Sequence, residues 1–120
     1  DPPDAGMELN DINWELFENH YKNLSEIFGY SMKPEESAIN HYGYQFLRVE
    51  KNVDKALEFF KKNVENYPKS ANVYDSYAEA LLAKGDKKNA IANFKKSLTM
   101  NPAPNVKANS EKYLKQLGAM

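Results

Sequence analysis

The sequence predicts an all-α fold, a right-handed stack of helical hairpins. Two observations carry this prediction. Apolar residues recur with the 3.6-residue period of an amphipathic helix in several segments of the chain. In addition, one pair of these segments repeats the pair before it at a spacing of 34 residues. A helical repeat of this length is typical of solenoids, in which each hairpin packs only on its neighbours.

The clearest hairpin spans residues 71–102. Its first helix has one apolar face, formed by Tyr74, Tyr77, Ala78, Leu81 and Leu82. Gly85 follows at the place where helices end in a left-handed residue, and Asp86 can cap the next helix through its carboxylate. That helix has an apolar stripe formed by Ala90, Ile91, Phe94, Ser97 and Leu98. Pro102 ends it, because proline disfavours helix in the residue before it.

A looser copy of this hairpin spans residues 37–68. At the 34-residue spacing, the matched pairs are Leu47 with Leu81, Ala56 with Ala90, Phe60 with Phe94, and Pro68 with Pro102. Counted back from Ala56, Gly43 and Tyr44 lie one residue earlier than the 34-residue spacing requires. This predicts one extra residue in the turn at 50–53. Since glycine inside a helix costs up to about 1 kcal/mol against alanine, we expect close packing at Gly43.

One further helix is expected on each side of the hairpins. After a linker at residues 1–10, a helix begins at about Asp11 and ends at Gly29, with a continuous seam of Trp14, Phe17, Tyr21, Leu24 and Phe28 that Leu16, His20 and Ile27 widen. We expect this seam to pack on the first hairpin, with packing on a preceding domain as the alternative. Pro34 suits the first turn of the next helix. A capping helix at 104–117 begins with Pro104 and turns inward Val106, Tyr113, Leu114 and Leu117.

The second hairpin resembles a tetratricopeptide repeat (TPR), a family with the pattern W-x2-L-G-x2-Y…A-x3-F…P. Here Tyr74 stands for the tryptophan, Tyr77-Ala78 for Leu-Gly and Leu81 for the tyrosine. The remaining pattern residues agree, namely Ala90, Phe94 and Pro102.

The chain also resembles the C-terminal TPR region appended to bacterial α/β-hydrolases of the esterase type. The most specific matches are Asn-Val-Glu-Asn-Tyr-Pro at 63–68 and Ala-Asn-Val-Tyr-Asp-Ser at 71–76. Shorter ones are Leu24-Ser25, Gly29-Tyr30, Pro34-Glu35, Ile39-Asn40 and Gly43-Tyr44. The resemblance implies a non-catalytic interaction or scaffold domain, with the catalytic domain and its catalytic residues upstream of Asp1. A free-standing adaptor that binds a peptide is the alternative.

Composition and charge narrow the possible partners. The chain has no cysteine, so it has no disulfide and no thiolate metal site. No apolar run has the length of a membrane span and no signal peptide is present, which leaves the compartment open between cytoplasm and periplasm.

Residues 1–50 have a net charge of −7 and residues 51–120 of +6. This asymmetry fits two solvated faces, or a basic partner surface in the second half. Nucleic acid is not expected, since the chain has one arginine and scattered lysines.

We find no catalytic constellation in the sequence. Ser31 lies in Gly-Tyr-Ser-Met-Lys, which lacks the second glycine of a nucleophile elbow. His20 and His41 have no metal-ligand spacing to a partner, and no glycine-rich phosphate loop occurs. Asp75 and Glu79 are an i, i+4 acidic pair, which is more typical of a solvated face than of catalysis. We therefore expect no enzyme activity, no cofactor, no metal, and a protein or peptide as partner.

The first helix of each hairpin is expected to line a concave groove. The candidate lining residues are Asn40, His41, Tyr44 and Arg48 in the first hairpin and Asn72, Asp75, Glu79 and Leu82 in the second. The carboxylates of Asp75 and Glu79 would repel an acidic ligand. Any ligand of this groove should therefore be a neutral or basic peptide or a loop of the parent hydrolase. The alternative is a groove that binds nothing, in a domain that only packs on its neighbour.

Overall fold

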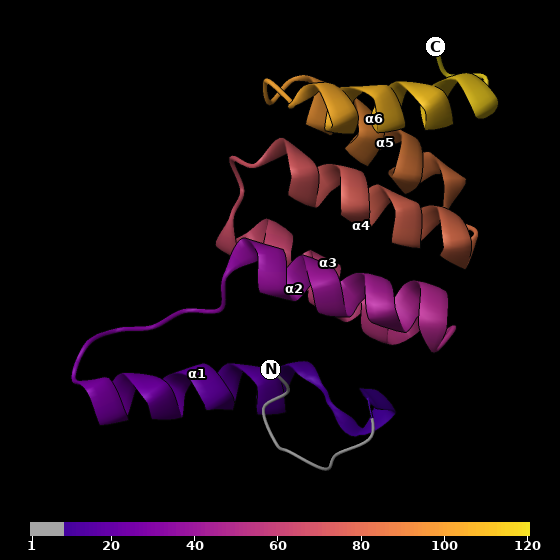
Figure 1. Ribbon diagram of the computed structural model, residues 1–120. Helices are drawn as coiled ribbons and strands as arrows, with labels where there is room; N and C mark the ends of the chain where they lie inside the picture. Colours follow the sequence, from indigo (N-terminus) through magenta and orange to yellow (C-terminus); the bar gives the residue numbers. More distant parts are fainter. Residues whose placement is uncertain (1–8) are drawn as a thin grey trace.

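The computed structural model describes residues 9–120, and this part of the chain is all-helical, as predicted (Figure 1). A 3₁₀ turn (η1, Leu9–Asp11) precedes α1 (Trp14–Phe28). The other elements are α2 (Glu36–Tyr44), a π-helical turn that extends it (η2, Gln45–Val49), α3 (Val53–Asn66), α4 (Ala71–Lys84), α5 (Lys87–Leu98) and α6 (Pro104–Gln116). Residues 1–8 of the predicted linker lie outside the described residues.

The helices from α2 onward form two layers. Consecutive helices run antiparallel and pack on each other, and α4 also packs on both α2 and α6 (Figure 1). Helices α2, α4 and α6 therefore lie side by side in one layer, and α3 and α5 form the other. Helix α1 lies at one end of this stack and α6 at the opposite end (Figure 1). The longest dimension of the molecule is 49 Å.

The two hairpins differ by one residue in the turn that joins their helices. Residues 36–49 of α2 and η2 correspond to residues 71–84 of α4 at a spacing of 35, whereas α3 and α5 begin at 53 and 87, a spacing of 34. The first turn thus holds three residues and the second holds two, which confirms the predicted extra residue. Lys51 and Gly85 have left-handed backbones at φ values of 56° and 93°, immediately before the capping residues of α3 and α5.

This shift changes which residues correspond in the first helices. Phe46 is fully buried and Leu81 is 6% exposed, while Leu47 is half-buried. Phe46 is therefore the counterpart of Leu81, and the match of Leu47 with Leu81 at a spacing of 34 was wrong by one residue. The physical reason is the extra residue in the turn. It shifts the sequence correspondence of the whole first helix by one residue relative to that of the second helix.

In each hairpin, the same kind of hydrogen bond also joins the two helices at the end opposite the turn. The side-chain amide of Asn63 donates to the carbonyl oxygen of Glu36 at 3.1 Å, and the hydroxyl of Ser97 donates to that of Ala71 at 2.8 Å. In both cases the donor is a fully buried side chain near the end of the second helix. The acceptor is the first residue of the first helix. Because a buried polar group without a partner is costly, these bonds fix where the two ends meet.

Gly43 packs directly against α3. A Cβ atom at this position would collide with the ring of Phe60, which is itself fully buried and lies edge-on to Tyr44. The predicted close packing is therefore confirmed. The helices approach each other at a point where no side chain fits.

Replacing Gly43 with alanine is expected to destabilise the protein. Overpacking a core typically costs about 1–3 kcal/mol. The better helix propensity of alanine returns about 1 kcal/mol of this. We expect a net loss of up to about 2 kcal/mol in urea-induced unfolding. Adding Phe60→Leu should recover part of the loss if the collision is its cause, whereas a Gly43→Ala variant more stable than the wild type would contradict this packing.

Helix α1 packs on the stack through its N-terminal half only. Trp14 and Phe17 are buried, and both rings meet Phe59 of α3 at 5.4 Å. Further along, Ile27 is 72% and Phe28 57% exposed. Figure 1 shows the reason, because the C-terminal end of α1 extends past the ends of α2 and α3. The prediction of a continuous packed seam was therefore wrong for this half of the helix.

The boundaries of the flanking helices agree with the prediction to within three residues. Helix α1 begins at Trp14 rather than near Asp11, because the Asn13 side chain caps it by accepting from the N–H of Leu16. Helix α2 begins at Glu36, so Pro34 precedes the helix instead of lying in its first turn. Helix α6 begins at Pro104 as predicted and buries Val106 and Leu114, while Tyr113 and Leu117 are half-buried.

Candidate functional site

A hollow of about 590 Å³ lies where α2 faces α4. It brings together five of the eight candidate groove residues, namely Asn40, His41, Tyr44, Arg48 and Asn72. The sequence did not indicate the other three lining residues, which are Glu36, Ser37 and Gln45. The lining comes from α2, from η2 and from the first turn of α4, so the hollow is a feature of the layer that contains the first helices of the hairpins.

The lining of the hollow is polar, and some of its groups already have partners within the chain. The guanidinium of Arg48 is already engaged, since it donates to Glu79 at 3.3 Å and lies 4.2 Å from the centre of the Tyr44 ring. Glu36 accepts one hydrogen bond, from the hydroxyl of Ser70 at 2.9 Å. Asn40 Oδ1 is buried without a hydrogen-bond partner in the described part of the chain.

Asp75 does not face an open groove, because α6 covers it. The residue is 4% exposed. Its carboxylate accepts from the hydroxyl of Ser110 at 2.6 Å and from the amide of Asn109 at 2.9 and 3.1 Å. Helix α6 thus covers the position at which the sequence predicted Asp75 as a lining residue of the groove.

Glu79 is the centre of a polar cluster that joins three helices. Its side chain is 9% exposed and accepts hydrogen bonds from Tyr44 and Arg48 at the α2 end of the layer and from Asn109 and Tyr113 of α6. The shortest bond, from the Tyr44 hydroxyl, is 2.6 Å long. We call Tyr44, Arg48, Asp75, Glu79, Asn109, Ser110 and Tyr113 the carboxylate cluster.

These contacts correct the expected role of the acidic pair. Asp75 and Glu79 accept hydrogen bonds from the chain itself and are enclosed, so they do not line an open groove. Leu82, the last candidate lining residue, is half-buried and packs on the apolar core around Leu81 and Phe94. The open part of the candidate groove is therefore its first-hairpin side together with Asn72.

Burial shifts the pKa values of three members of the carboxylate cluster, Asp75, Tyr44 and Tyr113. It raises the pKa of Asp75 above the ordinary 3.8, although the hydrogen bonds from Ser110 and Asn109 act in the opposite direction. Burial, followed by the nearby Glu79 carboxylate, also raises the pKa of Tyr44 and of Tyr113. Both tyrosines therefore stay protonated at neutral pH and donate to Glu79.

The raised pKa of Asp75 predicts a pH-dependent contribution to stability. Above pH 3.8 the native protein binds a proton at Asp75 more strongly than the unfolded chain does, so stability falls as the pH rises through the native pKa. Asp75→Asn removes this titration. We expect the unfolding free energy of the wild type, minus that of Asp75→Asn, to be smaller at pH 7 than below pH 4, as measured by urea unfolding. A difference that grows with pH would contradict the burial argument.

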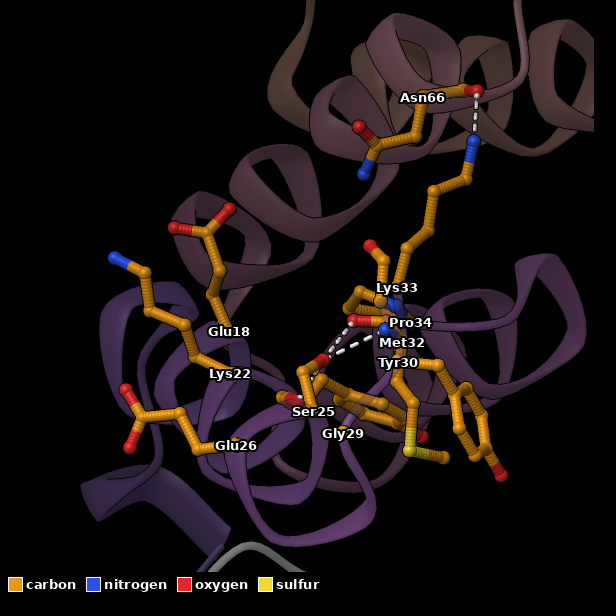
Figure 2. A pocket seen from close by; sticks show the side chains of 12 residues that line it. Glu18, Lys22, Ser25, Glu26, Gly29, Tyr30, Met32, Lys33, Pro34 and Asn66 are labelled. Atoms are coloured by element: carbon orange, nitrogen blue, oxygen red, sulfur yellow. Dashed lines mark hydrogen bonds between the residues drawn. The ribbon is translucent and has the colours of Figure 1, made fainter.

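A larger hollow of about 720 Å³ lies between α1 and the connection from Gly29 to Pro34 (Figure 2). Glu18, Lys22 and Glu26 extend along one side of it, and Lys33 and Asn66 lie across from them (Figure 2). Its internal contacts hold the connection in place: Ser25 Oγ accepts from the N–H of Met32 at 2.6 Å, and Lys33 Nζ donates to the Asn66 carbonyl at 3.2 Å. Since two lysines balance two glutamates, this hollow has no marked charge preference.

The sequence reasoning missed Asn109 and Ser110 of α6. They lie 34 and 35 residues after Asp75, the same spacings that relate the two hairpins. Extending the repeat comparison beyond Pro102 would have placed them opposite Asp75. Tyr113 was expected to point inward, but its bond to Glu79 depends on the tertiary arrangement.

Residues 9–120 contain neither a candidate metal site nor a candidate membrane span. No group of three or more histidine and acidic side chains there could hold a metal ion. No helix in that range is both long and apolar enough to cross a bilayer. No protein-family model matches the chain, and neither a curated protein nor a solved structure matches it.

Proposed function

We propose that the chain is a non-catalytic protein-interaction domain built from two TPR-type repeats, with α1 and α6 as the flanking helices. The observation that supports this most directly is the equivalence of the two hairpins. Their helices recur at spacings of 35 and 34 residues, and each pair is closed by a side chain that donates to the first carbonyl of the hairpin. Repeats of this kind present one layer of helices to a partner.

In this proposal the domain is the C-terminal accessory part of a larger bacterial hydrolase. The motifs at 63–68 and 71–76 support this context. The reading frame upstream of Asp1 should then encode a domain with a Gly-x-Ser-x-Gly elbow. The isolated chain should hydrolyse no activated ester. Turnover that survives repurification, with a fluorophosphonate label on a serine of this chain, would show that the domain is itself catalytic.

The alternative is a free-standing adaptor that binds a neutral or basic peptide in the hollow between α2 and α4. Its support is the carboxylate of Glu36 in the lining, together with the ion pair that links the guanidinium of Arg48 to Glu79. A ligand that brings N–H donors or a positive charge fits these groups better than a carboxylate does.

NMR titration of the isotopically labelled chain separates these cases. A lysine-rich peptide should shift the amide signals of Asn40, His41 and Asn72 if the hollow is the binding site. Asn72→Ala should weaken that binding, while Asn23→Ala, at an exposed position on α1, should not. Tight and saturable binding of an acidic peptide in the hollow, with shifts centred on Asn40, His41 and Asn72, would overturn the expected ligand charge.

A further inference from the structure

The positive charge of the second half is concentrated in its last two helices. Residues 87–120 contain seven lysines and one acidic residue, a net side-chain charge of +6, whereas residues 51–86 are neutral. All seven lysines are exposed, and none forms an ion pair within the described residues: Lys87, Lys88, Lys95, Lys96, Lys107, Lys112 and Lys115. We call these seven side chains the lysine surface.

The lysines near the N-terminal ends of α5 and α6 do not serve helix stability, unlike Lys95, Lys96 and Lys115, which lie in the last turns and complement the helix dipole. A helix N-terminus favours acidic side chains, and α1, α2 and α3 each have one in the first turn. Helices α4, α5 and α6 have none there, and α5 begins with Lys87 and Lys88 directly after its acidic cap, Asp86. Lys107 follows in the early part of α6. Because these charges oppose the helix dipole, intramolecular stability does not explain them.

We propose that the lysine surface binds an acidic polypeptide segment of a partner protein. Charge complementarity is the main argument, since seven exposed ammonium groups without an ion pair in the described residues attract a run of carboxylates. This surface lies at the end of the molecule formed by α5 and α6, far from α1 (Figure 1). It is separate from the hollow between α2 and α4, so it does not depend on the proposed ligand of that hollow.

Two other polyanions fit this surface less well. Nucleic-acid surfaces usually combine arginine with exposed aromatic rings, but residues 87–120 have no arginine, Phe94 is buried and Tyr113 is half-buried. A membrane-bound helix needs exposed apolar side chains beside its lysines. Among the large apolar side chains of α5, α6 and the residues after them, Met120 alone is strongly exposed, at 61%.

The experiment measures binding of a labelled peptide of alternating glutamate and serine by fluorescence anisotropy at physiological salt. The triple variant Lys107→Gln, Lys112→Gln and Lys115→Gln should bind about tenfold more weakly, because each exposed pair contributes a small share. The matched control replaces Lys22, Lys61 and Lys69 with glutamine and should bind like the wild type. All six positions are exposed, so both variants should keep the circular dichroism of the wild type.

The result that supports the proposal is salt-dependent peptide binding that the α6 triple variant weakens and the control does not. Equal loss of peptide binding in both variants would overturn the proposal, because binding would then depend on the net charge of the protein and not on the lysine surface. Tighter binding of phosphatidylserine vesicles or of single-stranded DNA than of the peptide would also overturn it. So would light scattering that shows the chain associating with itself through this surface, since the acidic first half of a second copy would then be the occupant.

Discussion

Replacing Phe59 with alanine is expected to lower the free energy of unfolding by about 3–5 kcal/mol. Phe59 is fully buried on α3, where its ring meets Trp14 and Phe17 of α1 and Phe46 of η2 at 5.1–5.4 Å. The substitution therefore removes the side chain that joins α1 to the first hairpin. Since small domains have about 5–15 kcal/mol of stability in total, this loss is a large fraction of it.

Urea unfolding followed by circular dichroism and by the fluorescence of Trp14 measures this effect. Trp14 is the only tryptophan and lies edge-on to Phe59, so its signal reports locally on the contact. The matched control is Phe28→Ala on α1, which removes an identical but 57% exposed side chain and should cost less than about 0.5 kcal/mol. If Phe28→Ala were the more costly variant, the half of α1 that is packed would have been assigned wrongly.

The features that the sequence predicted well depend on neighbours in the chain. Gly85 and Asp86 end one helix and cap the next through contacts with residues a few positions away, and Pro104 begins α6 for the same reason. The 34-residue repeat predicted that α4 packs on α5 as the first hairpin's helices pack on each other, because similar apolar patterns pack in similar ways. Even the extra residue between α2 and α3 followed from comparing the two copies.

The features that the sequence did not predict depend on where a helix ends relative to distant ones. The apolar pattern of α1 continues to Phe28, but the stack that it packs on does not extend that far. In the same way, the i, i+4 spacing of Asp75 and Glu79 places both on one helix face without saying what covers that face. Only the packing of α6 on α4 shows that the pair is enclosed rather than solvated.

Replacing Glu79 with alanine is expected to cost about 2–4 kcal/mol, because it removes the acceptor of four donors. The hydroxyls of Tyr44 and Tyr113 would lose their bonds to Glu79, and burial keeps both protonated. The Glu79→Gln variant retains one acceptor oxygen and should lose less. Arg48→Ala should cost below about 1 kcal/mol, since 62% of that side chain is exposed.

A double-mutant cycle of Glu79→Gln with Tyr44→Phe tests whether the cluster acts as a unit. The two substitutions share the 2.6 Å bond between Tyr44 and Glu79, so their effects on unfolding should not add. A second cycle, of Glu79→Gln with Tyr113→Phe, tests the corresponding coupling between α4 and α6. Coupling in both cycles would mean that one carboxylate holds α2 and α6 against α4. Additive effects in both would instead mean that apolar packing alone sets the arrangement of that layer, and the hollow beside Tyr44 would then keep its shape in Glu79→Ala.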